Sequence, residues 1–161
     1  MTDCSQLWAQ FVKLANEMET TRVSLLNSCS ETISGMMHSA FHAPDQRGVA
    51  FELIHWLPHE SRKEFLSELT ELASYANKYT EAARRAILEL PRGWTVANIR
   101  SAYEPILQRE SSDVEEFGLL LSLVNELDES FAKQIALQAE KHRNPSVQEI
   151  GTTYLARASS L

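Results

Sequence analysis

The stretch Ile54-His55-Trp56-Leu57-Pro58 occurs twice more along the chain in nearly the same form. Ile87-Leu88-Glu89-Leu90-Pro91 follows 33 residues later, and Val124-Asn125-Glu126-Leu127-Asp128 follows after 37 more. Each stretch has an aliphatic residue, a leucine three positions on, and then a residue that breaks a helix or caps the next one. We interpret the three stretches as the junctions of a helix-turn-helix unit that is repeated three times along the chain.

On both sides of these junctions, apolar residues recur every three to four positions, which is the period of an α-helix. The five prolines and five glycines fall almost wholly at the edges of these apolar runs. No run shows the sustained alternation that is typical of a β-strand. The sequence therefore predicts an all-α fold.

Residues suited to the N-cap position mark where helices should begin. The first helices of successive pairs are expected to start, 32 to 35 residues apart, near Asp45, Thr80, Ser112 and Asn144. Ser61 and Ser112 each have a glutamate three positions on, which is the spacing of a capping box. Thr95 is expected to cap the next helix, and Pro105 should kink or shorten it.

A period of this length is typical of stacked units that cannot bury an apolar face alone. On its junctions and helix starts, the segment 45–159 resembles a HEAT- or armadillo-type α-solenoid. The resemblance implies antiparallel helix pairs stacked as a short right-handed α-solenoid. The tetratricopeptide repeat has a similar period, but its Trp, Gly, Tyr and Ala positions are not reproduced in register. A closed helical bundle is the alternative fold, because it gives amphipathic helices at similar spacing.

The N-terminal segment fits the repeat less well. One face collects Leu7, Phe11, Leu14, Ala15 and Met18, and an apolar stripe continues to about residue 40. We expect one long helix or two, with Thr20-Thr21 as the weak point. Residues 1–40 are interpreted as an N-terminal helical cap on a single all-helical domain that spans 1–161; a role in dimerisation stays open.

Composition narrows the classes of partner. The 161 residues (18.2 kDa) contain 15 Lys and Arg against 22 Asp and Glu, a net charge of −7. This acidity disfavours binding to phosphate backbones and favours a basic protein as partner. A small basic zone between Lys78 and Arg100 is too limited to reverse that expectation, so no nucleic-acid partner is predicted.

The compartment is expected to be cytoplasmic. Two cysteines, Cys4 and Cys29, are too few for a disulfide framework. We expect both to be free, reduced thiols, as is usual in the cytosol. The first residues lack the basic and apolar regions of a signal peptide. No apolar run approaches the length of a membrane-spanning helix, so no membrane partner is predicted.

Acidic side chains gather in two places. Glutamates 60, 64, 68 and 71 step by four, four and three positions, and residues 104–129 contain eight acids against one base. We predict an electrostatic docking surface for a basic partner, with two aromatic anchors that contribute if they are exposed. The predicted partner-binding residues are Glu60, Glu64, Glu68, Glu71, Trp94, Tyr103, Glu110, Asp113, Glu115 and Glu116.

Motifs for catalysis are scarce. The chain has no nucleophile elbow, no phosphate-binding glycine loop and no Cys-x-x-Cys. The pairs His38/His42 and His55/His59 have the spacing of metal ligands on a helix, but Pro58 interrupts the second pair. We therefore predict no catalytic residue, no metal and no cofactor.

Three functions follow from this pattern. The first is a non-enzymatic protein-binding module, most concretely an acidic immunity protein or inhibitor that occludes the active site of a basic toxin or enzyme. This prediction rests on analogy of fold and charge. The second is an adaptor or regulatory scaffold that binds its partners through the same acidic surface. The third is a metal-dependent enzyme that uses the histidine pairs.

Overall fold

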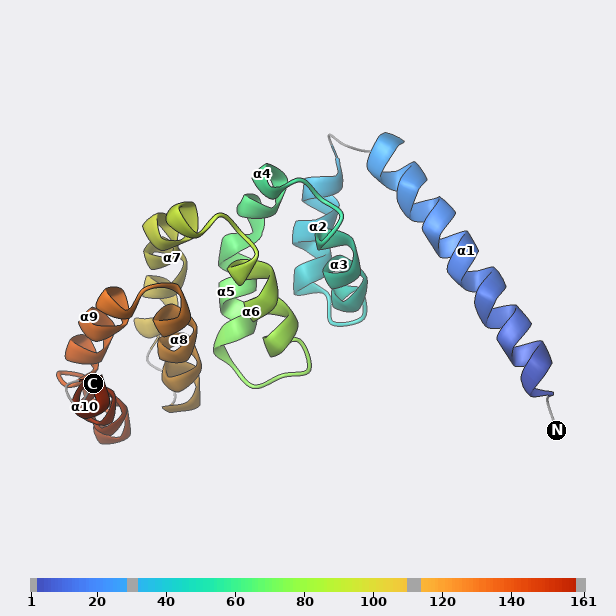
Figure 1. Ribbon diagram of the computed structural model, residues 1–161. Helices are drawn as coiled ribbons and strands as arrows, with labels where there is room; N and C mark the ends of the chain where they lie inside the picture. The colour runs from blue at the N-terminus through green and yellow to red at the C-terminus, as the bar shows by residue number, and fades with distance from the viewer. Residues whose placement is uncertain (1–2, 29–31, 110–113, 159–161) are drawn as a thin grey trace. The chain divides into compact units, whose positions relative to one another are not determined.

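The computed structural model describes residues 3–28, 32–109 and 114–158, and within these ranges the chain is helical with no strand (Figure 1). This confirms the all-α prediction. The elements are α1 (Cys4–Ser28), α2 (Ile33–His42), α3 (Arg47–Ile54), α4 (His59–Arg62), the 3-10 helix η1 (Lys63–Phe65), α5 (Leu66–Ser74), α6 (Thr80–Leu88), α7 (Arg92–Leu107), α8 (Val114–Leu127), α9 (Glu129–Ala139) and α10 (Pro145–Ala158). Among the described residues, no helix has both the length and the apolar character needed to cross a bilayer.

The chain divides into two compact units, Met1–Leu57 and Pro58–Leu161. The sequence places a boundary between residues 40 and 45, whereas the division falls inside the first repeated junction. Helices α2 and α3 therefore belong to the N-terminal unit, although α3 was expected within the first repeat. That the whole chain forms one domain stays a prediction.

In the N-terminal unit, α2 and α3 pack against each other through aromatic rings. Phe41 and Phe51 meet edge to face with their centroids 5.3 Å apart, and Phe41 is 1% exposed. The Arg47 Nε donates a hydrogen bond of 2.7 Å to the Phe41 carbonyl, which fixes the turn between the two helices. Helix α1 is different, because most of its side chains are exposed.

In the C-terminal unit, α5 packs against α6, α7 and α8, and α8 packs in turn against α9 and α10. The core between these helices is aliphatic and aromatic. Leu69, Ile87, Ile99 and Leu123 are each fully buried. On α8, Phe117, Leu121 and Val124 follow one another at steps of three and four and are all buried, which is the pattern that helical periodicity predicts for an inner face.

The three repeated junctions share two local features, although the preceding helix ends at a different point in each, at Ile54, at Leu88 and at Leu127. Their paired apolar residues are buried in every copy: Ile54 with Leu57, Ile87 with Leu90, and Val124 with Leu127. The next helix begins directly after each pair, with Pro58, Pro91 and Asp128 at the N-cap position. The aliphatic pair and the capping residue therefore end one helix and start the next at all three places.

Some predicted helix starts agree with the structure, and others are wrong by a few residues. α6 begins at Thr80 as expected, and α3 begins at Arg47, one position later than an N-cap at Asp45 would place it. Ser61 lies inside α4 without capping it. α7 begins at Arg92, because the proline-defined backbone of Pro91 starts the helix before Thr95 is reached. The Thr95 hydroxyl instead donates to the Pro91 carbonyl at 3.2 Å.

Of two other helix ends, the sequence anticipated one. α7 ends at Leu107, two residues beyond Pro105, so this proline lies inside the helix and does not shorten it as expected. α10 begins at Pro145, where Asn144 Oδ1 accepts a hydrogen bond of 3.0 Å from the Ser146 amide. The predicted capping box at Ser112 lies outside the described residues.

Candidate functional site

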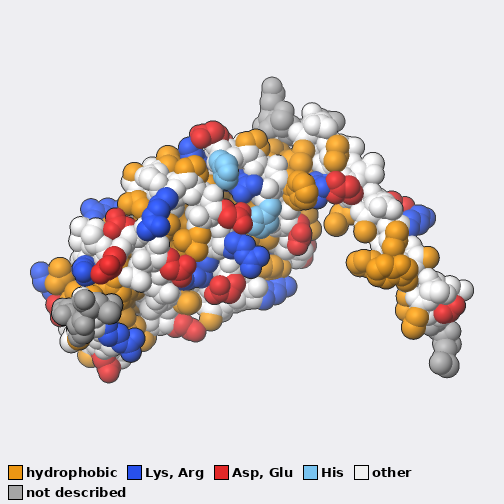
Figure 2. Space-filling model, viewed as in Figure 1, with side chains coloured by type: hydrophobic (Ala, Val, Ile, Leu, Met, Phe, Trp, Pro, Cys, Tyr) orange, Lys and Arg blue, Asp and Glu red, His pale blue; other side chains and the backbone are white. Residues whose placement is uncertain are grey.

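The four glutamates of the 60–71 segment do not form an uninterrupted negative stripe. They are distributed over α4, η1 and α5, because a 3-10 turn buries Phe65 and interrupts the regular helix. Glu60 lies 2.6 Å from Lys63 Nζ, and Glu71 lies 3.2 Å from Arg109 Nη2. Figure 2 shows acidic and basic side chains interleaved over this unit. Ion pairs within the chain thus neutralise part of the predicted surface.

The other two members of this stripe differ in exposure. Glu64 is exposed on η1, whereas Glu68 is half-buried on α5. Of these two glutamates, Glu64 is therefore the more accessible to a partner.

The acidic start of α8 is the second predicted part of the surface. Glu115 is exposed and Glu116 half-buried in the first helical turn, where negative charge favourably meets the helix dipole. The α8 sequence contains a third acid, Glu126, and no Lys or Arg. The predicted residues Glu110 and Asp113 lie outside the described residues.

The two predicted aromatic anchors have different environments. Tyr103 is 1% exposed and packs on Phe131 with ring centroids 5.4 Å apart, so it belongs to the core and is not available to a partner. Burial raises the pKa of its phenol. Trp94 is half-buried on α7, with Lys63 Nζ 5.2 Å from its ring centroid. Trp94 alone retains an accessible ring surface.

The histidine pairs are arranged differently from each other. His38 and His42 both lie on α2, whereas His55 ends α3 and His59 begins α4 on the other side of Pro58. Within the described ranges, no group of three or more His, Cys, Asp and Glu side chains is placed to hold a metal ion.

A groove between α8 and α10 is a feature that sequence reasoning missed. Its volume is about 930 Å³, and Val114, Gly118 and Leu121 line it from one face of α8. The other lining residues are Ser122, Asn125, Glu129, Ser146, Glu149, Ile150, Thr153, Tyr154, Arg157 and Ala158. The signal in the sequence was Gly118, a residue without a side chain inside a leucine-rich helix.

Polar groups at one end of the groove are held in fixed positions. The Tyr154 hydroxyl donates to Asn125 Oδ1 at 2.5 Å, which joins α10 to α8. Burial, followed by the nearby negative charge of Glu129, raises the pKa of Tyr154. Glu129 is itself held 2.8 Å from Lys133 Nζ. This end of the groove therefore offers oriented hydrogen-bonding groups beside the apolar floor.

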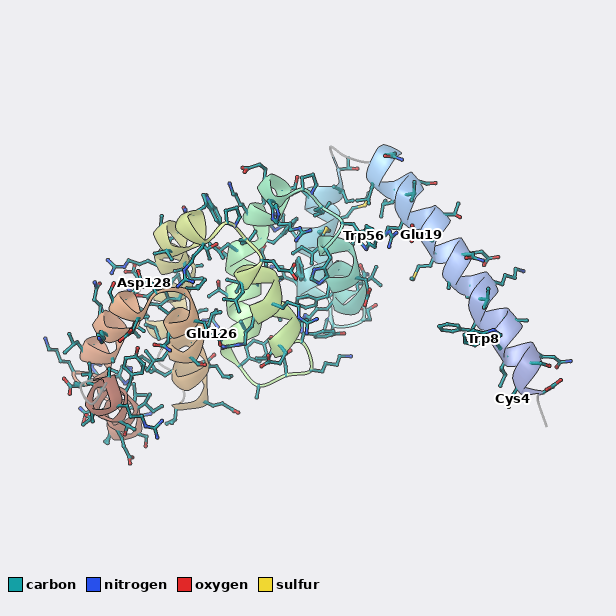
Figure 3. All side chains as sticks on the ribbon, in the orientation of Figure 1. Cys4, Trp8, Glu19, Trp56, Glu126 and Asp128 are labelled. Carbon is teal, nitrogen blue, oxygen red and sulfur yellow. The ribbon has the colours of Figure 1, made fainter. Side chains whose placement is uncertain are left out.

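Arg84 is a second feature that the sequence did not reveal, because its place in the basic zone between Lys78 and Arg100 does not show what its side chain contacts. Its side chain is 9% exposed and reaches from α6 to α8. The guanidinium donates to the Leu119 carbonyl at 3.1 Å, to Ser122 Oγ at 3.3 Å, and to the Glu126 carboxylate. Figure 3 labels Glu126 on α8. The Glu126 carboxylate stays exposed at the surface, but the Arg84 guanidinium neutralises its charge.

The chain was compared with models of protein families, with curated proteins and with solved structures, and none of these comparisons found a match.

Proposed function

We propose that this chain is a non-enzymatic protein-binding module that binds a basic protein in the groove between α8 and α10. The observation that carries the proposal is the combination of this groove of about 930 Å³ with the acidic first turn of α8. The most concrete form is an inhibitor, such as an immunity protein, that covers the active site of a basic toxin or enzyme.

The composition of the groove supports a protein ligand. Apolar side chains of Val114, Leu121 and Ile150 lie beside hydroxyl and amide groups of Asn125 and Tyr154. Protein interfaces combine an apolar centre with a polar rim in the same way. A helix or loop of the partner would place an apolar anchor over Gly118, and its basic residues would face the start of α8.

The helical-repeat arrangement belongs to the same proposal. A short stacked array is supported by the buried aliphatic pair at each of the three junctions. It is also supported by the contacts of α5 with α7 and α8 and of α8 with α9 and α10. Such arrays offer extended surfaces for protein partners. The same properties fit an adaptor, which would differ from an inhibitor in binding several partners weakly.

The first test is affinity capture from the source cell at low and high salt, followed by mass spectrometry. We expect one stoichiometric basic protein that is lost at high salt, because charge complementarity between the partners is screened by ions. Several weakly bound partners that resist salt would favour the adaptor. Capture of no protein at either salt would contradict the proposal.

Two variants then test whether the captured protein uses the groove. Gly118→Phe places a ring over the groove floor, and the added Cβ meets only Ile150 Cδ1, at 3.9 Å. We expect at least a tenfold loss of affinity by calorimetry. Gly93→Phe, at a helix position with nothing within 4 Å of its Cβ, is the matched control and should bind normally. Equal affinity of the two variants would refute the groove as the site.

The acidic turn is tested separately with Glu115→Gln combined with Glu116→Gln. This pair should weaken binding at low salt and flatten its salt dependence, while thermal unfolding changes little. Glu52→Gln combined with Glu140→Gln removes the same charge from two other exposed positions and serves as control. Unfolding of the Glu115/Glu116 variant would instead show that these acids are structural.

A further inference from the structure

Helix α1 carries the largest exposed apolar face among the described residues. Leu7, Trp8, Phe11, Leu14 and Met18 are 51%, 66%, 63%, 55% and 62% exposed. Trp8 and Phe11 stack with their ring centroids 5.9 Å apart. Figure 2 shows these hydrophobic side chains gathered along α1, and Figure 3 labels Trp8 near its N-terminal end. Isolated exposed apolar residues are ordinary, but a continuous face of this size marks an interaction surface.

The spacing of this face is that of a coiled-coil seam. Starting at Cys4, the positions alternate in steps of three and four, which is the a/d pattern of a heptad repeat. The seam positions are Cys4, Leu7, Phe11, Leu14, Met18, Thr21 and Leu25. None of them is charged, and Trp8 lies immediately beside the seam. An ordinary surface helix of a globular protein has a wider apolar stripe.

From this seam we infer that α1 pairs with α1 of a second copy of the chain, in an antiparallel coiled coil. With the pair centred between Val12 and Lys13, Leu7 faces Met18 of the second copy and Phe11 faces Leu14. Every large seam residue from 7 to 18 then meets an apolar partner. The inference does not depend on the proposed function, because it uses a different surface.

The area of the face is sufficient for a dimer. Side chains of this size offer roughly 150–250 Å² each when aromatic and somewhat less when aliphatic, so the five exposed residues supply about 600 Å² per copy. The pair would bury about 1,200 Å², which reaches the lower range of stable protein interfaces.

The charges of α1 favour a second copy over a lipid surface. Helices that lie on membranes carry Lys and Arg on their polar face. In α1, Lys13 and Arg22 are outnumbered by Asp3 beside its start and by Glu17 and Glu19. Arg22 is already engaged, because it pairs with Glu19 and its guanidinium carbon lies 3.4 Å from the centroid of the Trp56 ring.

The same contact favours the antiparallel direction. Trp56 packs against the C-terminal third of α1, where Leu25 and Leu26 are half-buried, so the rest of the N-terminal unit occupies that end of the helix. In an antiparallel pair, this bulk lies at opposite ends of the two copies. A parallel pair would bring both copies of it to the same end.

The test is the mass of the full chain in solution, measured by light scattering or sedimentation at tens of micromolar. We expect a dimer for the natural sequence and a monomer for Phe11→Glu combined with Leu14→Glu. Both positions are exposed, so this variant should keep its fold. Val49→Glu, at an apolar residue on α3 that is 67% exposed, is the matched control and should remain a dimer.

A monomeric natural chain, or a dimer that survives the Phe11/Leu14 substitutions, would overturn the inference. A monomer that sediments with vesicles containing anionic lipid would overturn it in favour of a membrane. Direction is tested in a Cys29→Ser background, in which Cys4 is the one remaining cysteine. Mild oxidation should not link the antiparallel dimer, because its two Cys4 thiols lie at opposite ends, and a Cys4-linked dimer would refute the antiparallel direction.

Discussion

Two glycines in the C-terminal unit have opposite surroundings, although both lie inside helices. A Cβ added to Gly118 on α8 would face the groove, with Ile150 Cδ1 at 3.9 Å. A Cβ added to Gly151 on α10 would lie 2.6 Å from the Ala136 carbonyl oxygen and 2.7 Å from the Ala139 Cβ. Gly151 is thus required for the close approach of α10 to α9, whereas Gly118 is not required for folding.

We therefore predict opposite effects of alanine at these positions. Gly118→Ala should raise the free energy of unfolding by about 0.5–1 kcal/mol, because it removes the entropic cost of glycine within a helix. Gly151→Ala should lower it by about 1–3 kcal/mol, because rigid backbone atoms of α9 must move. Urea unfolding followed by circular dichroism measures both. Similar effects from the two substitutions would contradict the packing of α10 on α9.

At this scale the sequence predicted burial better than capping. Leu121 and the junction residue Leu127 follow from helical periodicity alone, because periodicity determines which face points inward. Asp128 was recognised as a capping residue and accepts hydrogen bonds from the amides of Ser130 and Phe131. A hydrogen bond from the Ser130 side chain, followed by the bonds from these amides, lowers the pKa of the Asp128 carboxyl. Thr95 has an equally suitable side chain but lies within a helix that Pro91 had already started.

Between elements, Arg84 is the polar side chain that joins α6 to α8. It is nearly buried, while its partner Glu126 is 48% exposed. The guanidinium also donates to Leu119 and Ser122, so its role does not depend on the ion pair alone. Removing the arginine should accordingly cost more than removing the carboxylate charge.

We predict that Arg84→Ala lowers the free energy of unfolding by about 2–3 kcal/mol, through lost hydrogen bonds and lost packing of its aliphatic stem. Glu126→Gln should cost less than about 1 kcal/mol, because the carboxylate is half in water. The double variant measures the coupling between the two side chains. Arg85→Ala, at the exposed neighbouring position, is the control, and a cost equal to that of Arg84→Ala would contradict the bridging role.

Helices were easier to predict than their interruptions. The sequence left open one long helix or two, with Thr20-Thr21 as the weak point. The structure has two, α1 and α2, but α1 continues through both threonines to Ser28. Their hydroxyls donate within the helix, to the carbonyls of Asn16 and Glu17 at 2.9 and 2.8 Å. Gly118 indicated a gap in the surface of α8, but the sequence could not show that α10 would lie beside it and form a groove. Periodicity describes one helix at a time and contains no information on such pairs.

For the molecule as a whole, net charge was a poor guide to the local surface. The chain is acidic, with a net charge of −7, yet Glu60, Glu71 and Glu126 are each paired with a basic side chain. Those pairs join residues that are distant in sequence in two of the three cases, so a count along the chain cannot detect them. The accessible negative charge is consequently concentrated at fewer positions than the sequence suggested, the start of α8 among them.

The exposed face of α1 also has a consequence for the helix content of the whole molecule. Most of the stability of a helix in a protein comes from packing of its apolar face, and most side chains of α1 are exposed. If a second copy supplies that packing, helix content should fall when the dimer is diluted below its dissociation constant, because dissociation exposes the seam. Circular dichroism at 222 nm over a dilution series measures this change. The Phe11→Glu/Leu14→Glu variant should have the lower helix content at every concentration, whereas Val49→Glu should follow the natural chain. Helix content that is independent of concentration, and equal in all three proteins, would show that α1 is stable without a partner.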